Sequence, residues 1–193
     1  MRKMFSVIIF ILCLVTFIVA FAQPVSREEK TVRMSLIMVA NKCVGIGYQF
    51  NGTTPKGFDN AGFVLYVYQK NGITLPRTVK GMFSAGDYVD TKDAKPGDLL
   101  FFMEDPVTGS SITHVGIYLG KDKFVHMPGE GAYVRIERLV KDSKWSARFA
   151  GVRSYHKLFD EFIEKESNLS DKKEKVQALK NMDPEVQFET SDM

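Results

Sequence analysis

The apolar residues of this chain change their spacing near its middle, and this change limits the folds open to it. Between residues 32 and 43 they recur at intervals of four, three and four, which places Val32, Leu36, Val39 and Cys43 on one face of a helix. A second helical pattern follows Asp59, which can cap it, and ends at Asn71-Gly72. Residues 112–119 alternate instead, as in a half-buried strand. Helices followed by strands predict an α+β fold, with helices packed on a small antiparallel sheet.

The strands of this sheet are expected in the second half of the chain. Pro96-Gly97 closes a loop and is followed by residues 98–102, an apolar run that is typical of a buried strand. A weaker helical stretch is expected to end near Gly86. Alternation and turn residues predict further strands at residues 112–119, 124–127, 133–136 and 149–153.

The first 22 residues have the layout of a secretory signal. Arg2 and Lys3 precede an uncharged apolar run from Phe5 to Val19, and Ala20-Phe21-Ala22 forms a small-x-small cleavage site. We therefore expect cleavage after Ala22 and a secreted or periplasmic protein. The apolar run is long for a signal, so an uncleaved anchor is the alternative, and only in that case is membrane contact expected.

The composition changes again after His156. Beyond Glu164 the residues are mostly Lys, Glu, Asp, Ser, Asn and Gln with isolated apolar ones, which is typical of a solvated helix passing into disorder. The chain therefore divides into a signal peptide at 1–22, one domain at 23–156 and a charged helical or disordered tail at 157–193.

The charge balance argues against nucleic-acid binding. The full chain has a net charge of +3, which falls to +1 without Arg2 and Lys3. A protein that binds nucleic acid needs a concentrated basic surface, and this composition does not provide one. A mildly basic body with an acidic tail instead suits an anionic polymer such as cell wall.

Residues 45–62 form a motif that combines a turn-rich loop with the start of a helix. They read Gly-Ile-Gly-Tyr-Gln-Phe-Asn-Gly-Thr-Thr-Pro-Lys-Gly-Phe-Asp-Asn-Ala-Gly and resemble the signature of the NlpC/p60 family. Members of that family are papain-like cysteine peptidases that cut bacterial cell-wall stem peptides. Three later segments agree with the family in order and spacing: Leu75-Pro76-Arg77-Thr78, Lys95-Pro96-Gly97-Asp98-Leu99-Leu100-Phe101-Phe102, and Thr113-His114-Val115-Gly116-Ile117-Tyr118-Leu119-Gly120 with Phe124-Val125-His126.

The resemblance covers roughly residues 34–155 and implies a role for each matching position. The nucleophilic cysteine of the family falls on Asn60, its general-base histidine on His114 and its orienting third residue on His126. The tyrosine near the oxyanion site of the family falls on Tyr48. The positions that flank these residues, and that the resemblance places against substrate, are Asp59, Ala61 and Thr113.

At the nucleophile position the chain departs from the family. The side chain of Asn60 is a neutral amide that has neither a thiol nor a hydroxyl, so His114 cannot activate it. Ala61 replaces the usual serine, and Phe50-Asn51 replaces the tryptophan and first glycine of a Trp-Gly-Gly run. Changes that cluster around the nucleophile indicate a pseudoenzyme.

Three functions remain open at this point. The first is a catalytically inactive module that binds a peptidoglycan stem peptide or a cell-wall protein. The second is a working hydrolase in which His114 or Asp59 activates water. The third is a partner-binding protein that makes its contact through the acidic tail.

Neither a metal nor a cofactor is expected. An amide oxygen is a poor zinc ligand, and no further Cys, His or acidic residue recurs at ligand spacing around Asn60, His114 and His126. Cys13 lies inside the signal, which leaves Cys43 as the lone cysteine of the mature chain. Its position on the inward face of a predicted helix indicates a buried, inert thiol.

Overall fold

The computed structural model describes residues 27–105, 107 and 111–182. The expected signal peptide lies outside the described residues. No helix among the described residues combines the length and apolar character needed to cross a membrane.

Three α-helices come before the main sheet in the described chain. They are α2 (Arg27–Lys42), α3 (Asn60–Gln69) and α4 (Val79–Ala85), with the short pair β1 (Thr53–Thr54) and β2 (Gly57–Phe58) before α3. The strands of the main sheet follow, with one short 3-10 helix η1 (Thr91–Asp93) and one short α-helix α5 (Lys144–Arg148). The strands are β3 (Asp87–Val89), β4 (Leu99–Met103), β5 (Ile112–Gly120), β6 (Lys123–His126), β7 (Arg135–Arg138) and β8 (Phe149–Ser154).

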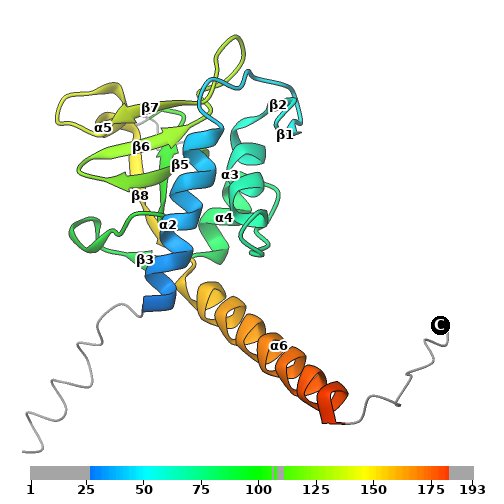
Figure 1. Ribbon diagram of the computed structural model, residues 1–193. Helices are drawn as coiled ribbons and strands as arrows, with labels where there is room; N and C mark the ends of the chain where they lie inside the picture. The colour runs from blue at the N-terminus through cyan, green and yellow to red at the C-terminus, as the bar shows by residue number, and fades with distance from the viewer. Residues whose placement is uncertain (1–26, 106, 108–110, 183–193) are drawn as a thin grey trace, which may run out of the picture.

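The main sheet has the strand order β3-β8-β4-β5-β6-β7, and neighbouring strands run antiparallel. The helices α3 and α4 pack against β5. The last helix, α6 (His156–Met182), begins beside α2 and then extends away from the body as one long rod (Figure 1). The predicted α+β fold with a small antiparallel sheet is confirmed.

Local chemistry explains where α3 begins. Oδ1 of Asp59 accepts a hydrogen bond of 2.6 Å from the N–H of Gly62, so Asp59 is the N-cap, as predicted. A β-carbon on Gly62 would lie 1.9 Å from the carbonyl oxygen of Gly52, so only glycine lets the helix approach the preceding loop this closely. The apolar side of α3, with Phe63 and Val67, is fully buried.

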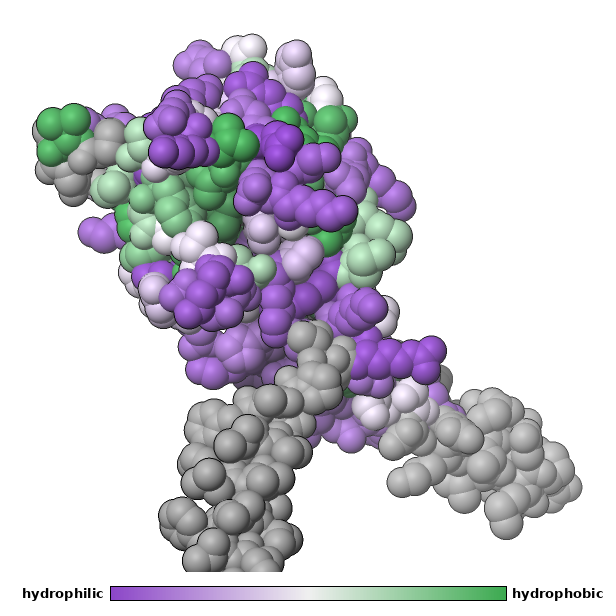
Figure 2. Space-filling model, turned by 90° about the vertical axis from the view of Figure 1, so that its left-hand side faces the viewer, coloured by the Kyte–Doolittle hydropathy of each residue, from purple (hydrophilic) through white to green (hydrophobic). Residues whose placement is uncertain are grey.

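Each face of the sheet has its own apolar core. The larger core lies between the sheet and the helices and includes Val115 and Ile117 of β5. The smaller core lies on the opposite face, where Trp145 of α5 packs on the side chains of Leu100, Phe102, Phe124 and Val152. On the surface seen in Figure 2, hydrophilic residues predominate and apolar residues form separate areas between them. Because side chains alternate along β5, His114 belongs to the smaller core.

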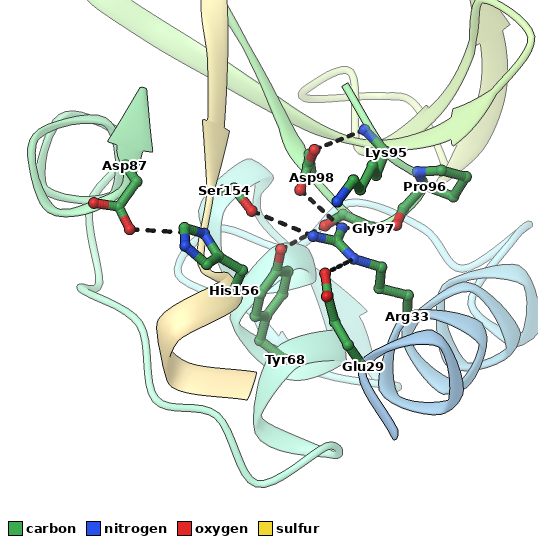
Figure 3. Close-up of polar contacts among 10 residues, drawn as sticks. All are labelled: Glu29, Arg33, Tyr68, Asp87, Lys95, Pro96, Gly97, Asp98, Ser154 and His156. Atoms are coloured by element: carbon green, nitrogen blue, oxygen red, sulfur yellow. Dashed lines mark hydrogen bonds and ion pairs between the residues drawn. The ribbon is translucent and has the colours of Figure 1, made fainter. Parts of the chain in front are cut away.

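A buried ion pair fastens α2 to the sheet (Figure 3). Nη1 of Arg33 donates to Oδ1 of Asp98 at 2.8 Å and to the carbonyl oxygen of Pro96 at 3.0 Å. Nε of Arg33 donates to Glu29 at 2.7 Å, and Nη2 lies 3.4 Å from the hydroxyl of Ser154 at the end of β8. Arg33 is 6% exposed and Asp98 1%, so water does not compete for this pair.

The elements differ from the predictions in several places. The strand predicted at 133–136 is β7 at Arg135–Arg138, because the backbone of Tyr133 instead forms an isolated bridge with Gly47. The charged tail is helical as far as Met182, longer than its composition indicated. The short elements β3 and α5 were not predicted, since segments of three and five residues carry too little periodicity.

Candidate functional site

Asn60, His114 and His126 come together at the N-terminus of α3. Asn60 is the first residue of this helix, His114 lies on β5 and His126 ends β6. Nδ2 of Asn60 lies 3.4 Å from Nε2 of His114, and the same nitrogen of His114 lies 2.7 Å from Nδ1 of His126. The structure therefore brings together three residues that are up to 66 positions apart in the sequence.

The side-chain amide of Asn60 is saturated by the backbone of the sheet. Its Oδ1 accepts a hydrogen bond of 3.2 Å from the N–H of Val115. Its Nδ2 donates to the carbonyl oxygens of Val115 and Met127, both at 3.1 Å. A primary amide has two N–H hydrogens, so the two carbonyls use both, and none remains for His114.

This amide bridges the end of the ladder between β5 and β6. The last pair in register is Ile117 with Val125. Continuing that register by two residues would set Val115 opposite Met127. Asn60 bonds to the backbone of both residues at this point. Its side chain therefore holds the helix and the two strands together, which is a structural role.

The two histidines are buried under an aromatic cover. His114 is 6% exposed and His126 is fully buried. The ring of Trp145 stacks on His114 with a centroid distance of 4.8 Å and an interplanar angle of 28°. The rings of Phe102 and Phe124 pack around the same pair. A ligand on the protein surface therefore cannot reach the imidazole of His126.

Glu137 of β7 sets the orientation of this pair. One of its oxygens accepts a hydrogen bond from the indole N–H of Trp145, and the other accepts one of 2.6 Å from Nε of Arg135. That second oxygen lies 3.6 Å from Nε2 of His126, a buried nitrogen that has no hydrogen bond within the described residues. The carboxylate favours a proton on Nε2 of His126, which leaves Nδ1 to accept the hydrogen bond from His114.

Burial keeps both histidines neutral. Burial holds the pKa of His114 well below its usual value, mainly because it removes water from the ring. The proximity of His126 and Arg148 lowers this pKa further. Burial, followed by the positive charges of Arg135 and Lys144, lowers the pKa of His126 to about 3. At neutral pH the pair is therefore two uncharged imidazoles that share one hydrogen bond.

The neutral histidines predict that the protein loses stability in acid. Below pH 6.5 each histidine of the unfolded chain takes up a proton, whereas in the folded protein His126 resists protonation down to about pH 3. The unfolded state then binds more protons, so the free energy of unfolding should fall by about 1.4 kcal/mol per pH unit for each histidine. Urea unfolding at pH 7, 6 and 5 measures this slope.

The variants His114→Gln and His126→Gln provide the comparison for this slope. Each variant should have a lower free energy of unfolding at pH 7. Its free energy of unfolding should also fall less steeply with pH, by about the contribution of one histidine, since the carboxylates contribute equally to the wild type and to the variant. Parallel curves for the wild type and both variants would show that the histidines are not held neutral.

The other predicted site residues have separate positions around Asn60. Asp59 uses one oxygen to cap α3 and the other to pair with Arg77. Ala61 is 6% exposed and lies inside the larger core. Thr113 is exposed on β5, and Tyr48 is half-buried beside Phe58, the residue that precedes the cap. Asp59, Thr113 and Tyr48 therefore remain accessible at the rim of the site, whereas Ala61 does not.

Sequence reasoning did not identify Trp145 or Glu137 as part of the site. Trp145 is the single tryptophan of the chain, which is a signal, but it lies 31 residues beyond His114 on an unpredicted helix. Glu137 alternates with exposed residues on an edge strand, and no local pattern distinguishes it from a surface carboxylate. Within the described part of the chain, no group of three or more His, Cys, Asp or Glu side chains is placed to hold a metal ion.

Comparison with protein families gives one match, in which the NlpC/P60 family accounts for residues 45–154. A γ-DL-glutamyl hydrolase of Bacillus subtilis is 35% identical over 146 residues, which are 72% of this chain and 35% of the relative. A γ-D-glutamyl-L-lysine dipeptidyl-peptidase of the same organism is 35% identical over 120 residues, which are 62% of this chain and 40% of the relative. The chain thus spans well under half of the length of these two relatives.

Solved structures agree with these matches. A crystal structure of an NlpC/P60 family protein from Bacillus cereus has a TM-score of 0.60 at 32% identity, and covers 64% of this chain and 40% of that one. The NlpC/p60 domain of the peptidoglycan hydrolase SagA has a TM-score of 0.53 at 32% identity, and covers 63% of this chain and 97% of that one.

Proposed function

The chain belongs to the NlpC/P60 family, and we propose that it is a member that binds peptidoglycan stem peptides in the cell wall without cutting them. The names of its two Bacillus subtilis relatives refer to γ-glutamyl bonds. The proposed ligand is accordingly a stem peptide that contains a γ-linked glutamyl residue. The protein would bind it outside the cell, after export through the N-terminal signal.

One observation carries the proposal, namely the use that the structure makes of Asn60. A covalent peptidase mechanism needs a nucleophile at the start of α3, and the amide found there has no ionisable group. Its oxygen and both of its hydrogens are taken up by Val115 and Met127. The position has therefore acquired a structural role that a cysteine could not fill, because a thiol is only a weak donor and acceptor.

A second support is the state of the histidine pair. Water activation would require a base that is accessible to solvent, and His126 is fully buried while His114 lies under Trp145. Asp59 is the other group that could activate water, but both of its oxygens are occupied. The accessible groups at the rim, Thr113 and Tyr48, suit the binding of a peptide backbone and its side chains.

The test combines a binding assay with a product assay. Purified protein should sediment with insoluble sacculi and bind soluble stem peptides with a Kd between about 1 μM and 1 mM, as expected for a shallow polar surface. It should release no new amino termini, whereas an active NlpC/P60 relative run in parallel releases them. Release at a rate comparable with that of the relative would show that the protein is an enzyme, and failure to sediment would remove the proposed ligand.

A further inference from the structure

A polar cavity lies beside the first half of α2, away from the histidine pair. It has a volume of about 250 Å³ and lies between α2, the loop before β4 and the end of β8. Along the ladder of β4 and β5, Phe102 faces His114, whereas Leu99, which follows Asp98, faces Ile117. The cavity is therefore at the opposite end of β4 from the histidines. Its polar lining includes Glu29 and Arg33 of α2, Asp93 of η1, Lys95 and Asp98 of the loop before β4, and Ser154 of β8.

The floor of the cavity contains a hydrogen-bond donor that has no acceptor. Figure 3 shows Arg33 between Glu29 of its own helix and Asp98 of the loop before β4. A guanidinium has five N–H donors. Three of them are taken by Glu29, Asp98 and Pro96, and a fourth is taken by the hydroxyl of Ser154 at 3.4 Å. The remaining N–H, on Nη2 of Arg33, has no hydrogen-bond partner within the described residues.

Ser154 supplies a second donor at the floor. Its oxygen accepts the hydrogen bond from Arg33, and the hydrogen of its hydroxyl finds no acceptor in the part of the chain that the structure describes. Arg33 is 6% exposed and Ser154 is 3% exposed, so bulk water has little access to either side chain. Buried donors without acceptors are unfavourable, and a carboxylate accepts strongly from charged N–H groups. The floor therefore favours an anionic acceptor inside the cavity.

The rim of the cavity carries one unpaired charge of each sign. Asp93 and Lys95 are both exposed and lie two positions apart. Among the described residues, neither side chain takes part in an ion pair or a hydrogen bond. Both residues are instead held through their backbone, because the N–H of Lys95 donates to Asp98 and the N–H of Asp93 donates to the carbonyl oxygen of Asp90. Their charged groups therefore remain available to a ligand.

The presence of both signs of charge limits what the cavity can hold. An anion would satisfy the donors of Arg33 and Ser154 but would leave Asp93 without a partner, and a simple cation would do the reverse. Across the described ranges, no group of three or more acidic, His or Cys side chains could hold a metal ion. A volume of about 250 Å³ is also below the roughly 300–1,000 Å³ of sites for drug-sized molecules. A fitting ligand is small and carries both charges.

A free α-amino acid meets these conditions, because it carries a carboxylate and an ammonium group on one carbon. We propose that the cavity binds a free α-amino acid, whose carboxylate accepts from Arg33 and Ser154 and whose ammonium group donates to Asp93. Lys95 contacts the same carboxylate from the rim. A residue within a peptide has lost at least one of the two charges, so the cavity selects against peptides. This inference goes beyond the proposed function and does not depend on it, since the two ligands bind at opposite ends of β4.

The first test uses three ligands that separate the two charges. Alanine carries both, propionate lacks the ammonium group, and ethylamine lacks the carboxylate. In calorimetric titrations of the wild-type chain, L-alanine or D-alanine should bind with a Kd below about 10 mM. Ethylamine should bind roughly 10- to 100-fold more weakly, because the buried donors lose a charged acceptor. Propionate should bind about threefold more weakly, because Asp93 is exposed and contributes less.

Variants of the lining assign each charge to its partner. Ser154→Ala should weaken the binding of alanine and propionate about tenfold and leave that of ethylamine unchanged. Asp93→Asn should weaken alanine and ethylamine about threefold and leave propionate unchanged, whereas Lys95→Ala should weaken alanine and propionate by a similar factor. Lys92→Ala is the matched control, because Lys92 is exposed, pairs with Asp90 and does not line the cavity. It should bind all three ligands as the wild type does.

Amide chemical shifts locate the bound ligand. Alanine should shift the amide signals of Asp98 and Ser154 and leave that of Val115, which bonds to Asn60, unchanged. Circular dichroism checks that each variant is folded, and the exposed position of Asp93 keeps the test open if Ser154→Ala does not fold.

Three results would overturn the inference. The first is no binding of either enantiomer of alanine below about 10 mM. The second is an affinity for propionate or ethylamine equal to that for alanine, and the third is a set of shifts centred on Val115. Each leaves the proposed function standing, which the sedimentation of the protein with sacculi tests separately.

Discussion

Replacing Asn60 by cysteine is expected to produce cleavage of γ-glutamyl bonds, which we propose the wild-type protein does not cut. A thiol at this position would lie at the positive end of α3, which lowers the pKa of a cysteine. Nε2 of His114 lies 3.4 Å from the amide nitrogen that the thiol would replace, and burial keeps this ring neutral. Nε2 can take the proton of the thiol once its hydrogen bond to His126 breaks and the ring adopts the tautomer with its hydrogen on Nδ1. Release of amino termini from stem peptides should rise at least about 100-fold above the wild-type background.

Three controls separate chemistry from structure in this experiment. Asn60→Ser removes the same amide bridge without adding a thiol, so it should show the same loss of stability and no cleavage. Adding His114→Ala to Asn60→Cys should abolish the new activity. An introduced thiol should also alkylate near neutral pH, whereas Cys43 should react slowly because it is 3% exposed and burial raises its pKa.

Two results would contradict the geometry described for the site. An introduced thiol that does not alkylate would mean that position 60 is neither accessible nor activated. Activity that survives the loss of His114 would mean that another group takes the proton from the thiol.

The Asp98→Ala variant is expected to lose about 3–5 kcal/mol of folding free energy, because it leaves Arg33 buried without its main counter-charge. Asp98 also accepts the N–H of Lys95 at 2.8 Å, so the loop before β4 loses a second contact. Urea unfolding followed by the fluorescence of the single buried tryptophan, Trp145, measures the change.

A double variant and an exposed pair test the cause of this loss. Arg33→Met combined with Asp98→Ala removes both charges and should recover part of the stability that Asp98→Ala loses, since the buried guanidinium is no longer present. Lys92→Ala breaks an exposed pair with Asp90 at 3.8 Å and should cost no more than about 1 kcal/mol. A loss below about 1 kcal/mol in Asp98→Ala would show that water solvates Arg33 in the variant.

Much of the fold could be predicted from the sequence because the patterns that indicate it are local. The cap of Asp59 on Gly62 spans three residues, and the alternation of β5 depends on side chains that point to opposite faces of one strand. The sequence also showed that position 60 has neither a thiol nor a hydroxyl, since the chemistry of an amide does not depend on its surroundings. Matching motifs then placed Asn60, His114 and His126 in one site before their distances were known.

What the sequence could not show are the contacts between segments that are distant along the chain. Trp145 covers His114 from a helix of five residues, and the pairing of Arg77 with Asp59 joins two different loops. The amide of Asn60 finds its partners in Val115 and Met127, 55 and 67 residues away. The sequence by itself determined the fold class, the family motifs and the presence of an amide at position 60. Only the tertiary structure decided that the histidines are buried and neutral, that Asn60 is a structural bridge and that Arg77 is exposed beside it, because burial and hydrogen-bond partners depend on how separate elements pack.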